Sequence, residues 1–188
     1  MLKILVLGKN GQLGQAIDQN RGPWEYEFLD RDEVDLSDTE SVSKALQSKE
    51  FDILINAAAY TAVDKAESEV ELCHAINAIA PGELATLCQN RGAVLIHIST
   101  DYVFGSDWNR PLEEDFPTDP INAYGEAKWL GEEAIRKNLE SHIIIRTSWL
   151  YGLAGHNFPK TMLRLAESRD ELNVVFDQVG NPTFADDL

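Results

Sequence analysis

The chain has 188 residues, of which 44% are hydrophobic, and this is enough for one substantial core, so a single globular domain is expected. Its 32 acidic and 16 basic residues give a net charge of −16, which argues against nonspecific binding to nucleic acid or to an anionic membrane surface. The apolar runs are too short to span a bilayer, and Met1 leads directly into strand-like sequence, so neither a membrane span nor a signal peptide is predicted.

The first third of the chain alternates short apolar runs with helix-like sequence. In order, we expect a strand at Lys3–Leu7, a helix from Gly11 to about Asn20, a strand at Glu25–Leu29, a helix to about Gln47 and a strand at Phe51–Ile55. Ser37, followed three residues later by Glu40, has the pattern of a capping box and marks the expected start of the second helix.

The same alternation continues to the end of the chain. We expect helical sequence from about Glu67 to Gln89, interrupted near Pro81 and closed by Gly92, and then a strand at Val94–Ile98. A loop at Gly105–Ile121, which could serve as a mobile lid, comes next. It is followed by a helix from Ala123 to Asn138 capped by Asn122, a strand at His142–Arg146 and a helix at Phe158–Ser168. Thr183–Leu188 resembles the start of a further helix, so we expect a fragment of a longer protein. Strands alternating with helices predict an α/β fold, namely a doubly wound parallel sheet of the Rossmann type in three αβα layers.

A glycine-rich turn follows the first expected strand and opens the first expected helix. Gly8, Gly11 and Gly14 allow a tight turn, close approach of a pyrophosphate and close packing of helix on strand. The phosphates would lie against free N–H groups at the start of the helix. The spacing is G-x-x-G-x-x-G rather than the common G-x-G-x-x-G, so an ordinary glycine-rich turn is the rival interpretation.

Acidic and basic side chains after the second strand bear on the choice of cofactor. Asp30 is suited to accept hydrogen bonds from a ribose 2′-hydroxyl, which favours NADH, whereas Arg31 is suited to a 2′-phosphate, which favours NADPH. The sequence leaves this choice open, and a solvated Arg31 is an equal alternative. Asp35 resembles an acid that contacts adenine, although it would also serve as a turn cap.

The catalytic candidates are Tyr124 and Lys128, which one helical turn would separate on the same face. A nearby cation favours the phenolate, so we expect Lys128 to lower the pKa of Tyr124 and make it a proton donor near neutral pH. Thr100, with Ser99 as the alternative, would hydrogen-bond the substrate oxygen, and Lys128 would also bond the nicotinamide ribose. Small residues at Ala57–Ala59 would let a cofactor lie against the backbone.

Several other residues that attract notice have structural interpretations. We expect His97 and Trp108 to be packing residues, whereas Trp149 follows a strand and is expected to face a ligand. Cys73 and Cys88 lack the spacing of a redox or zinc motif and are expected to be buried reduced thiols of a cytoplasmic protein. The sequence has no His/Cys/acid cluster with metal-ligand spacing, so no metal is predicted.

With these residues in place, the chain resembles the extended short-chain dehydrogenase/reductase superfamily, and within it the dTDP-4-dehydrorhamnose reductase family. The resemblance covers essentially the whole chain. The matching segments are Gly8–Gly14 (GKNGQLG), Asn56–Glu67 (NAAAYTAVDKAE), Ser99–Phe104 (STDYVF), Asn122–Lys128 (NAYGEAK), Arg146–Tyr151 (RTSWLY), Asn157–Ala166 (NFPKTMLRLA) and Asp177–Thr183 (DQVGNPT).

The resemblance implies a function and a set of site residues. Nicotinamide would deliver hydride to C4 of a dTDP-linked 4-keto-6-deoxy sugar and give dTDP-L-rhamnose, with Tyr124 as proton donor. The implied cofactor contacts are Gly11, Gln12, Leu13, Asp30, Asp35, Leu36, Ala59, Tyr60, Thr61, Tyr124 and Lys128, and the implied substrate contacts are Thr100, Asp101 and Trp149.

The resemblance also bears on assembly and on the extent of the chain. Some members of the family form homodimers bridged by magnesium through acidic side chains. Gln15 and Ala16 occupy the corresponding region here, which puts that metal site in doubt, and the sequence leaves the oligomeric state open, with a homodimer as one possibility. Members continue into a substrate-binding lobe, so residues 1–188 are expected to be the NAD(P)-binding Rossmann domain without that lobe.

Two other functions fit the same residues. One is a nucleotide-sugar epimerase or dehydratase on the same scaffold, which the Tyr/Lys pair does not exclude but the family-specific segments oppose. The other is a noncatalytic binding protein, because the regulatory subunit of methionine adenosyltransferase resembles this family as well.

Overall fold

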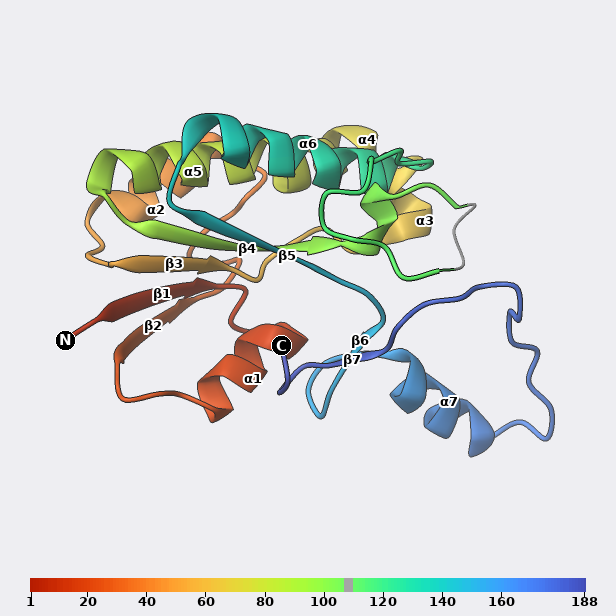
Figure 1. Cartoon of the computed structure of the whole chain (residues 1–188). Coiled ribbons are helices and arrows are strands. Elements are labelled where there is room, and N and C mark those ends of the chain that lie inside the picture. The colour runs from red at the N-terminus through yellow and green to blue at the C-terminus, as the bar shows by residue number, and fades with distance from the viewer. Residues whose placement is uncertain (107–109) are drawn as a thin grey trace.

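The computed structural model describes residues 1–106 and 110–188. Its centre is a parallel sheet with the strand order β2-β1-β3-β4-β5 (Figure 1). The strands are β1 Lys3–Leu7, β2 Glu25–Leu29, β3 Ile53–Asn56, β4 Val94–Thr100 and β5 His142–Thr147. The chain leaves β1 in one direction to form β2 and returns on the other side to form β3, so the strand order reverses between β1 and β3. The expected doubly wound parallel sheet is confirmed.

Helices cover the two faces of the sheet because right-handed crossovers in opposite directions lead to opposite faces. In Figure 1, α1 lies below the sheet, and α2, α5 and α6 lie above it. Their bounds are α1 Gln12–Gln19, α2 Thr39–Gln47, α5 Ala80–Arg91 and α6 Ala123–Asn138. The three expected layers are therefore present.

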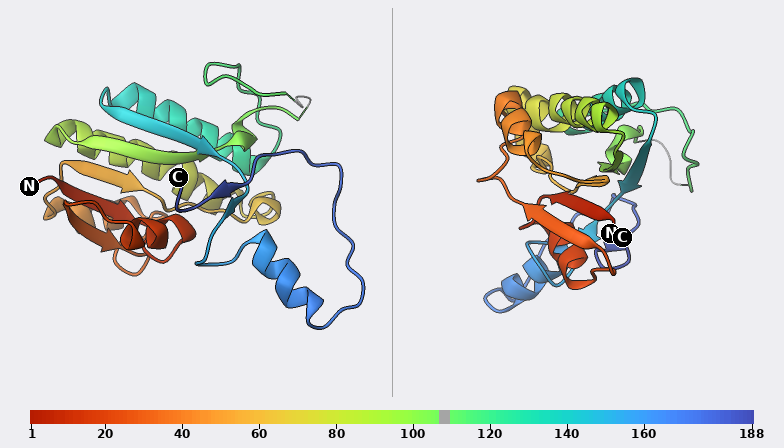
Figure 2. Two further views of the ribbon diagram at one scale, coloured as in Figure 1. Left: turned by 60° about the horizontal axis from the view of Figure 1, so that its bottom comes forward. Right: turned by 90° about the vertical axis from the view of Figure 1, so that its left-hand side faces the viewer.

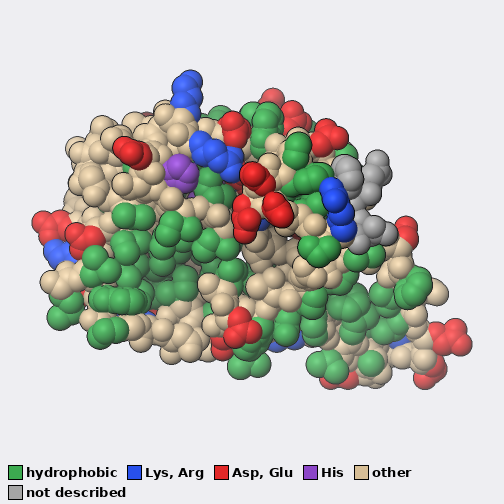
Figure 3. All heavy atoms as spheres, in the orientation of Figure 1, with side chains coloured by type: hydrophobic (Ala, Val, Ile, Leu, Met, Phe, Trp, Pro, Cys, Tyr) green, Lys and Arg blue, Asp and Glu red, His purple; other side chains and the backbone are tan. Residues whose placement is uncertain are grey.

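The main core lies between the sheet and the layer of α2, α5 and α6. Leu54 and Leu95 project from β3 and β4 and belong to one buried cluster with Leu46 of α2, Leu84 of α5 and Ile135 of α6. The opposite face is less covered, and Figure 3 shows hydrophobic side chains gathered over the strands on the visible face. The sheet is therefore anchored mainly by one of its two helical layers.

The N-terminal cap of α2 differs from the expected capping box. Asp38, not Ser37, is the N-cap, and its carboxylate accepts a hydrogen bond from the Glu40 backbone N–H at 2.9 Å. The Ser37 hydroxyl instead donates to Asp35 Oδ1 at 2.7 Å, in a turn that also uses the Ser37 backbone N–H. The expected cap is wrong because the Ser37 side chain already serves the Asp35 turn.

The helical sequence around Pro81 is continuous rather than broken. After α3 Val63–Ala66, the helix α4 Val70–His74 passes through a π-helical turn, η1 Ala75–Ile79, into α5. Pro81 lies in the first turn of α5, and the helix ends at Gly92, which has the left-handed φ of 67° that the sequence predicts for a cap. The π-helical turn carries the buried Asn77, which bonds both the backbone N–H and the carbonyl of Tyr60.

The last part of the chain lies on the same side of the sheet as α1. Beyond β4 come a short 3-10 turn, η2 Asp101–Val103, and, after β5, a small parallel pair, β6 Leu150–Tyr151 with β7 Thr183–Phe184. Helix α7 Phe158–Ala166 begins at the Asn157 cap, and Figure 2 shows it standing away from the sheet with the segment that follows it.

The C-terminal segment and the loop after β4 differ from, or lie beyond the test of, the sequence expectations. Thr183–Phe184 is a strand, not the start of a helix, because its backbone pairs with β6. Trp108, expected to be a packing residue, and part of the expected lid loop lie outside the described residues. Within the described ranges, no helix combines the length and apolar character needed to cross a membrane.

Candidate active site

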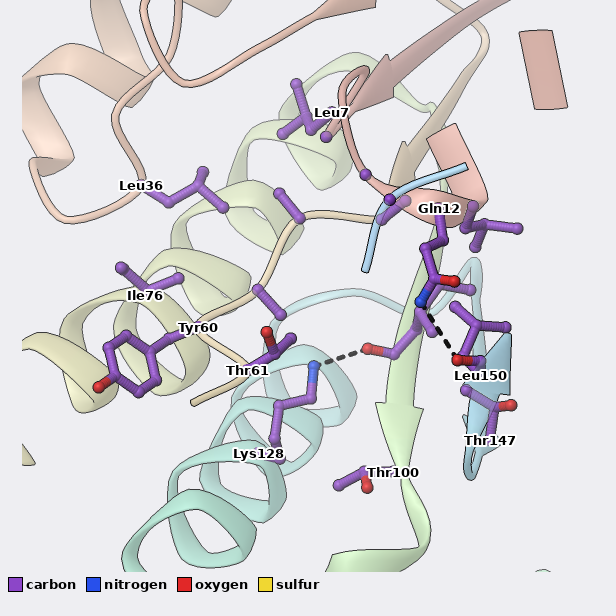
Figure 4. Close-up of a pocket in the computed structure, with 18 of the residues that line it drawn as sticks. Leu7, Gln12, Leu36, Tyr60, Thr61, Ile76, Thr100, Lys128, Thr147 and Leu150 are labelled. Carbon is purple, nitrogen blue, oxygen red and sulfur yellow. Dashed lines mark hydrogen bonds between the residues drawn. The ribbon is translucent and has the colours of Figure 1, made fainter. Parts of the chain in front are cut away.

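A cleft of about 820 Å³ opens at the carboxyl ends of the strands (Figure 4). This is where doubly wound sheets bind their ligands. The sequence-predicted site residues that line it are Gly8, Gly11, Gln12, Leu13, Asp30, Arg31, Asp35, Leu36, Ala57, Ala58, Ala59, Tyr60, Thr61, Thr100, Asp101, Tyr124, Lys128 and Trp149. Gly14 is the one predicted site residue outside this lining. The fold therefore brings residues from distant parts of the sequence to one cavity.

The glycine turn is built on close backbone contacts. Gly8 has a φ of 92°, and a Cβ there would lie 2.9 Å from the backbone of Ala57. A Cβ on Gly14 would lie 2.2 Å from the Gly8 carbonyl oxygen, so Gly14 acts in packing the turn rather than in facing the cleft. Gly11 is the N-cap of α1, and it has no side chain that could accept hydrogen bonds from the N–H groups of the first helical turn. The turn therefore presents bare backbone donors to the cleft.

The acids after β2 are already engaged. Asp30 accepts from the Asn10 side chain at 3.0 Å and from the Asp32 backbone N–H at 3.0 Å. Hydrogen bonds from Ser37, and to a smaller extent the charge of Arg31, lower the pKa of Asp35. Asp35 therefore caps a turn, one of its two predicted roles, while it still lines the cleft.

Gln12 ties the glycine turn to the far wall of the cleft. Its Nε2 donates to the Leu150 carbonyl at 3.2 Å (Figure 4), and its Oε1 accepts from Asn157 Nδ2 at 2.9 Å. Asn157 Oδ1 in turn accepts from the Lys160 N–H and caps α7. Both polar groups of the Gln12 side chain are thus used within the protein.

The catalytic candidates on α6 are positioned by the cap of that helix. As the sequence predicts, the Asn122 side chain accepts from the Gly125 N–H at 2.7 Å and starts α6 just before Tyr124. Tyr124 and Lys128 follow one turn apart, with side chains 9% and 1% exposed. The Tyr124 ring packs edge-on against Tyr102, with 5.6 Å between ring centroids.

The expected lowering of the Tyr124 pKa by Lys128 is wrong. Burial raises the pKa of Tyr124 to about 12, the Asp101 charge adds to the rise, and a hydrogen bond with Thr100 offsets part of it. Lys128 Nζ instead donates to the Ile98 carbonyl at 2.6 Å and lies 3.2 Å from His97 Nε2. Tyr124 therefore holds its proton at neutral pH, as a proton donor must before it acts.

Sequence reasoning missed two buried polar partners of the site. His97 is buried, as expected of a packing residue, but it also contacts Lys128, and its other ring nitrogen lies 3.1 Å from Asn56 Nδ2. Asn56 and His97 are directly paired across β3 and β4, near the ends of apolar runs. Two polar residues within otherwise apolar strand sequence were the available signal.

Trp149 and Thr147 form the β5 side of the cleft. Trp149 has a φ of 47°, unusual for a residue other than glycine, and its ring packs so closely on Gly180 that a Cβ there would lie 2.8 Å away. The Thr147 hydroxyl is buried and has no hydrogen-bond partner within the described part of the chain. A polar ligand group in the cleft would satisfy it.

The remaining sequence expectations concern thiols and metals. Cys73 and Cys88 are both free and buried, as predicted. Among residues 1–106 and 110–188, no group of three or more His, Cys, Asp or Glu side chains is arranged to hold a metal ion.

Comparison with known proteins gives one consistent result. The profile of the family described as the RmlD substrate binding domain matches residues 2–188. Curated relatives include the spore coat polysaccharide biosynthesis protein SpsK of Bacillus subtilis, 43% identical over 100% of this chain and 67% of the relative, and dTDP-4-dehydrorhamnose reductase of Escherichia coli, 44% identical over 98% of this chain and 64% of the relative.

A solved structure agrees with these relatives. The dTDP-4-dehydrorhamnose reductase of Bacillus anthracis in complex with NADP is 40% identical, with a TM-score of 0.95 over 100% of this chain and 68% of that one. The chain thus spans about two thirds of the length of the proteins it matches.

Proposed function

Since the chain belongs to the family of the RmlD substrate binding domain, we propose that it is the cofactor-binding part of an NAD(P)H-dependent reductase of a nucleotide-linked 4-keto-6-deoxy sugar. The reaction proposed is the reduction of dTDP-4-dehydrorhamnose to dTDP-L-rhamnose. Residues 1–188 act in it as one NAD(P)-binding Rossmann domain. The name and cofactor of the E. coli and B. anthracis relatives support this assignment.

One observation carries the proposal. The side chains of Thr100 and Tyr124 line the same cleft as the N-terminus of α1 and the glycine turn. The first is suited to a carbonyl oxygen and the second to a pyrophosphate. A dinucleotide stretched between them would bring its reactive ring next to the proton donor.

The residues present fit a dinucleotide. Close backbone contacts at Gly8 and Gly14 hold the glycine turn tightly, the Gly11 N-cap of α1 has no side chain to cap the helix, and Thr147 offers a buried hydroxyl without a partner in the described chain. Gly8, Gly11, Leu13 and Ala57–Ala59 would contact the cofactor through backbone or small side chains. Asp30 would bond the adenosine ribose.

In this reaction the bound nicotinamide supplies the hydride. Tyr124 gives its proton to the C4 oxygen as the new hydroxyl forms, and Thr100 orients that oxygen through its own hydroxyl. Asp101 and Trp149 bind the sugar nucleotide at the open side of the cleft. Burial of Tyr124 excludes water from the proton transfer and keeps the phenol protonated until the substrate arrives.

We further propose that the substrate is a dTDP-linked deoxysugar and that the protein works in the cytoplasm. A second copy of the chain, in a homodimer, is the macromolecular partner proposed. The two buried free thiols support a reducing compartment. The net charge of −16 opposes binding to nucleic acid. Either NADPH or NADH would serve as reductant, and the adjacent Asp30 and Arg31 support one choice each.

The deciding experiment is an assay of the full-length protein with dTDP-4-dehydrorhamnose and NADPH or NADH, followed by absorbance and by analysis of the sugar product. We expect equimolar oxidation of the cofactor and formation of dTDP-L-rhamnose. Conversion of the sugar without net oxidation of cofactor would favour an epimerase or dehydratase. Cofactor binding with no turnover of any dTDP-linked ketosugar would favour the noncatalytic binding protein.

A further inference from the structure

A buried chain of polar groups runs from the backbone after β3 to the catalytic lysine on α6. The Ala58 backbone N–H lies 3.2 Å from Asn56 Oδ1, Asn56 Nδ2 lies 3.1 Å from His97 Nδ1, and His97 Nε2 lies 3.2 Å from Lys128 Nζ. Asn56, His97 and Lys128 are each 1% exposed, so water does not compete for these contacts. Each group must therefore find its hydrogen-bond partner within the chain.

The direction of these hydrogen bonds is fixed at one end. A backbone N–H can only donate, so the atom of Asn56 that faces Ala58 must be the amide oxygen. The amide nitrogen of Asn56 then faces His97 Nδ1 and donates to it. His97 Nδ1 consequently acts as an acceptor and carries no proton.

The protonation of His97 follows from its burial. Burial, together with the nearby Lys128 charge, holds the pKa of His97 well below its usual value, so the ring is neutral at physiological pH. A neutral imidazole carries one proton, and with Nδ1 accepting from Asn56 that proton is on Nε2. The Nε2–H group points at Lys128 Nζ.

Two donors cannot bond one another, and this constrains Lys128. An ammonium group has three donors and no acceptor, whereas a neutral amine has one lone pair. The lone pair would accept from His97 Nε2–H while an amine N–H donates to the Ile98 carbonyl at 2.6 Å. Burial lowers the pKa of Lys128 to about 8, so the neutral form is within reach of ordinary pH.

The other groups facing Lys128 provide little opposing charge. Glu132, one turn further along α6, raises the pKa of Lys128, but its carboxylate is bonded by Ser99, Arg136 and Arg146. Cys73 from α4 is kept as an uncharged thiol because burial raises its own pKa.

We propose that His97 is a positioning residue which, with Asn56 behind it, stabilises the neutral amine form of Lys128 and fixes the direction of its side-chain nitrogen. The lysine nitrogen is thereby oriented by two fixed partners before any ligand enters the cleft. The importance of this for catalysis rests on the proposed function, but the protonation state itself does not.

The test uses the cofactor-free chain and nuclear magnetic resonance. Imidazole ¹⁵N shifts distinguish a protonated from an unprotonated ring nitrogen, and we expect His97 to carry its proton on Nε2. The Lys128 side chain, identified by loss of its signal in Lys128→Met, should titrate near pH 8. A proton on His97 Nδ1, or a Lys128 that remains charged well above this pH, would overturn the proposal.

Variants separate this role from simple packing. His97→Leu removes the donor to the amine, so the Lys128 pKa should rise by about 1 unit, whereas His97→Gln keeps an N–H donor and should largely restore the lower value. His142→Gln is the matched control, because the His142 ring at the start of β5 bonds the Leu139 carbonyl and its replacement should leave Lys128 unchanged. An unchanged Lys128 pKa in His97→Leu would contradict the proposal.

The outcome does not depend on turnover. Every measurement is made without cofactor or sugar, so absence of reductase activity would leave the proposal standing, and a failed titration test would leave the proposed reaction standing. If His97→Leu does not fold, the tautomer in the unmodified protein and the His97→Gln titration still decide the question.

Discussion

The Glu132 carboxylate and the Arg146 guanidinium form a bidentate ion pair that joins α6 to β5. Arg146 Nε donates to Oε1 at 2.9 Å and Arg146 Nη2 to Oε2 at 2.6 Å. The Ser99 hydroxyl adds a third hydrogen bond to Oε1 at 2.6 Å, and the guanidinium also lies 4.7 Å from the centre of the Phe104 ring. This pair fixes the end of β4, which carries Thr100, against the helix that carries Tyr124.

Replacing Glu132 with Gln should destabilise the protein strongly. The side chain is fully buried, and loss of its charge would leave the mostly buried Arg146 guanidinium without its carboxylate partner, at a cost of about 3–5 kcal/mol. Urea denaturation at neutral pH measures this difference. Glu133→Gln, at a 51% exposed side chain paired with Arg136, is the matched control and should change stability by less than about 1 kcal/mol.

The same pair should make stability depend on acid pH. Burial works to raise the pKa of Glu132, but hydrogen bonds from Arg146, Ser99 and Arg136 outweigh it, so the folded pKa lies below the ordinary value. The contribution of Glu132 is present above that ordinary value and is lost as pH falls through the lower folded pKa. A stability difference between wild type and Glu132→Gln that did not shrink on acidification would contradict this.

Lys128→Met should change how stability depends on pH. The pKa of Lys128 falls from 10.5 to about 8 on folding because the ammonium is buried, so below pH 8 the folded state bears a cost of about 3 kcal/mol. The unfolded chain binds the extra proton between these values, so the wild type gains stability as pH rises through that range. Denaturation at several pH values should show that this gain is absent in Lys128→Met.

Gly14→Ala should impair cofactor binding although Gly14 does not line the cleft. Its Cβ would lie 2.2 Å from the Gly8 carbonyl oxygen, so the turn must shift, and overpacking of this kind costs about 1–3 kcal/mol. In wild type, NADPH or NADH should raise the melting temperature, and this rise should be lost or greatly reduced in the variant. Gly92→Asn, at a left-handed cap with open space around it, should keep the full rise.

Tyr124→Phe removes the proposed proton donor and keeps the ring. General acid catalysis contributes about 10²–10⁴-fold, so kcat of the full-length enzyme should fall by that order. Cofactor affinity should change little, because a single hydroxyl is a minor part of the contact. Steady-state kinetics and a binding titration measure the two effects, and near-normal turnover would mean that the proton comes from another group.

Arg31→Ala tests the cofactor choice. If the guanidinium meets the 2′-phosphate, the variant should bind NADPH about tenfold or more weakly while its affinity for NADH changes little. Titration of both cofactors gives the comparison. Equal losses for the two would mean that Arg31 is a solvated residue of the cleft wall.

Much of the fold follows from local sequence patterns. The strand at Lys3–Leu7 and the Asn122 cap were predictable because a buried parallel strand and a helix start each leave a short local signature. Ser37 was misassigned because its hydroxyl bonds Asp35, while the neighbouring Asp38 takes the N-cap position of α2. Which of the two residues caps the helix is decided by the tertiary path of the chain rather than by the pattern.

The candidate site also has features that the local sequence predicts and features that it does not. Tyr124 and Lys128 share a helix, so their spacing was readable, but the direction of the Lys128 side chain was not. It depends on Ile98 and His97, thirty or more residues away in sequence on a different element. Protonation states inside a core follow from such long-range contacts, which no local motif encodes.

The link from Gln12 to Leu150 and Asn157 has a consequence for protein engineering. The first βαβ unit of a Rossmann domain is often treated as a cassette that can be exchanged to alter cofactor use. Here the Gln12 carboxamide hydrogen-bonds across the cleft to residues about 140 positions later in the chain. Its nitrogen donates to the Leu150 carbonyl, and its oxygen accepts from the Asn157 side chain. A chimaera that transplants residues 1–30 from a relative should therefore carry residues 150–157 from the same donor.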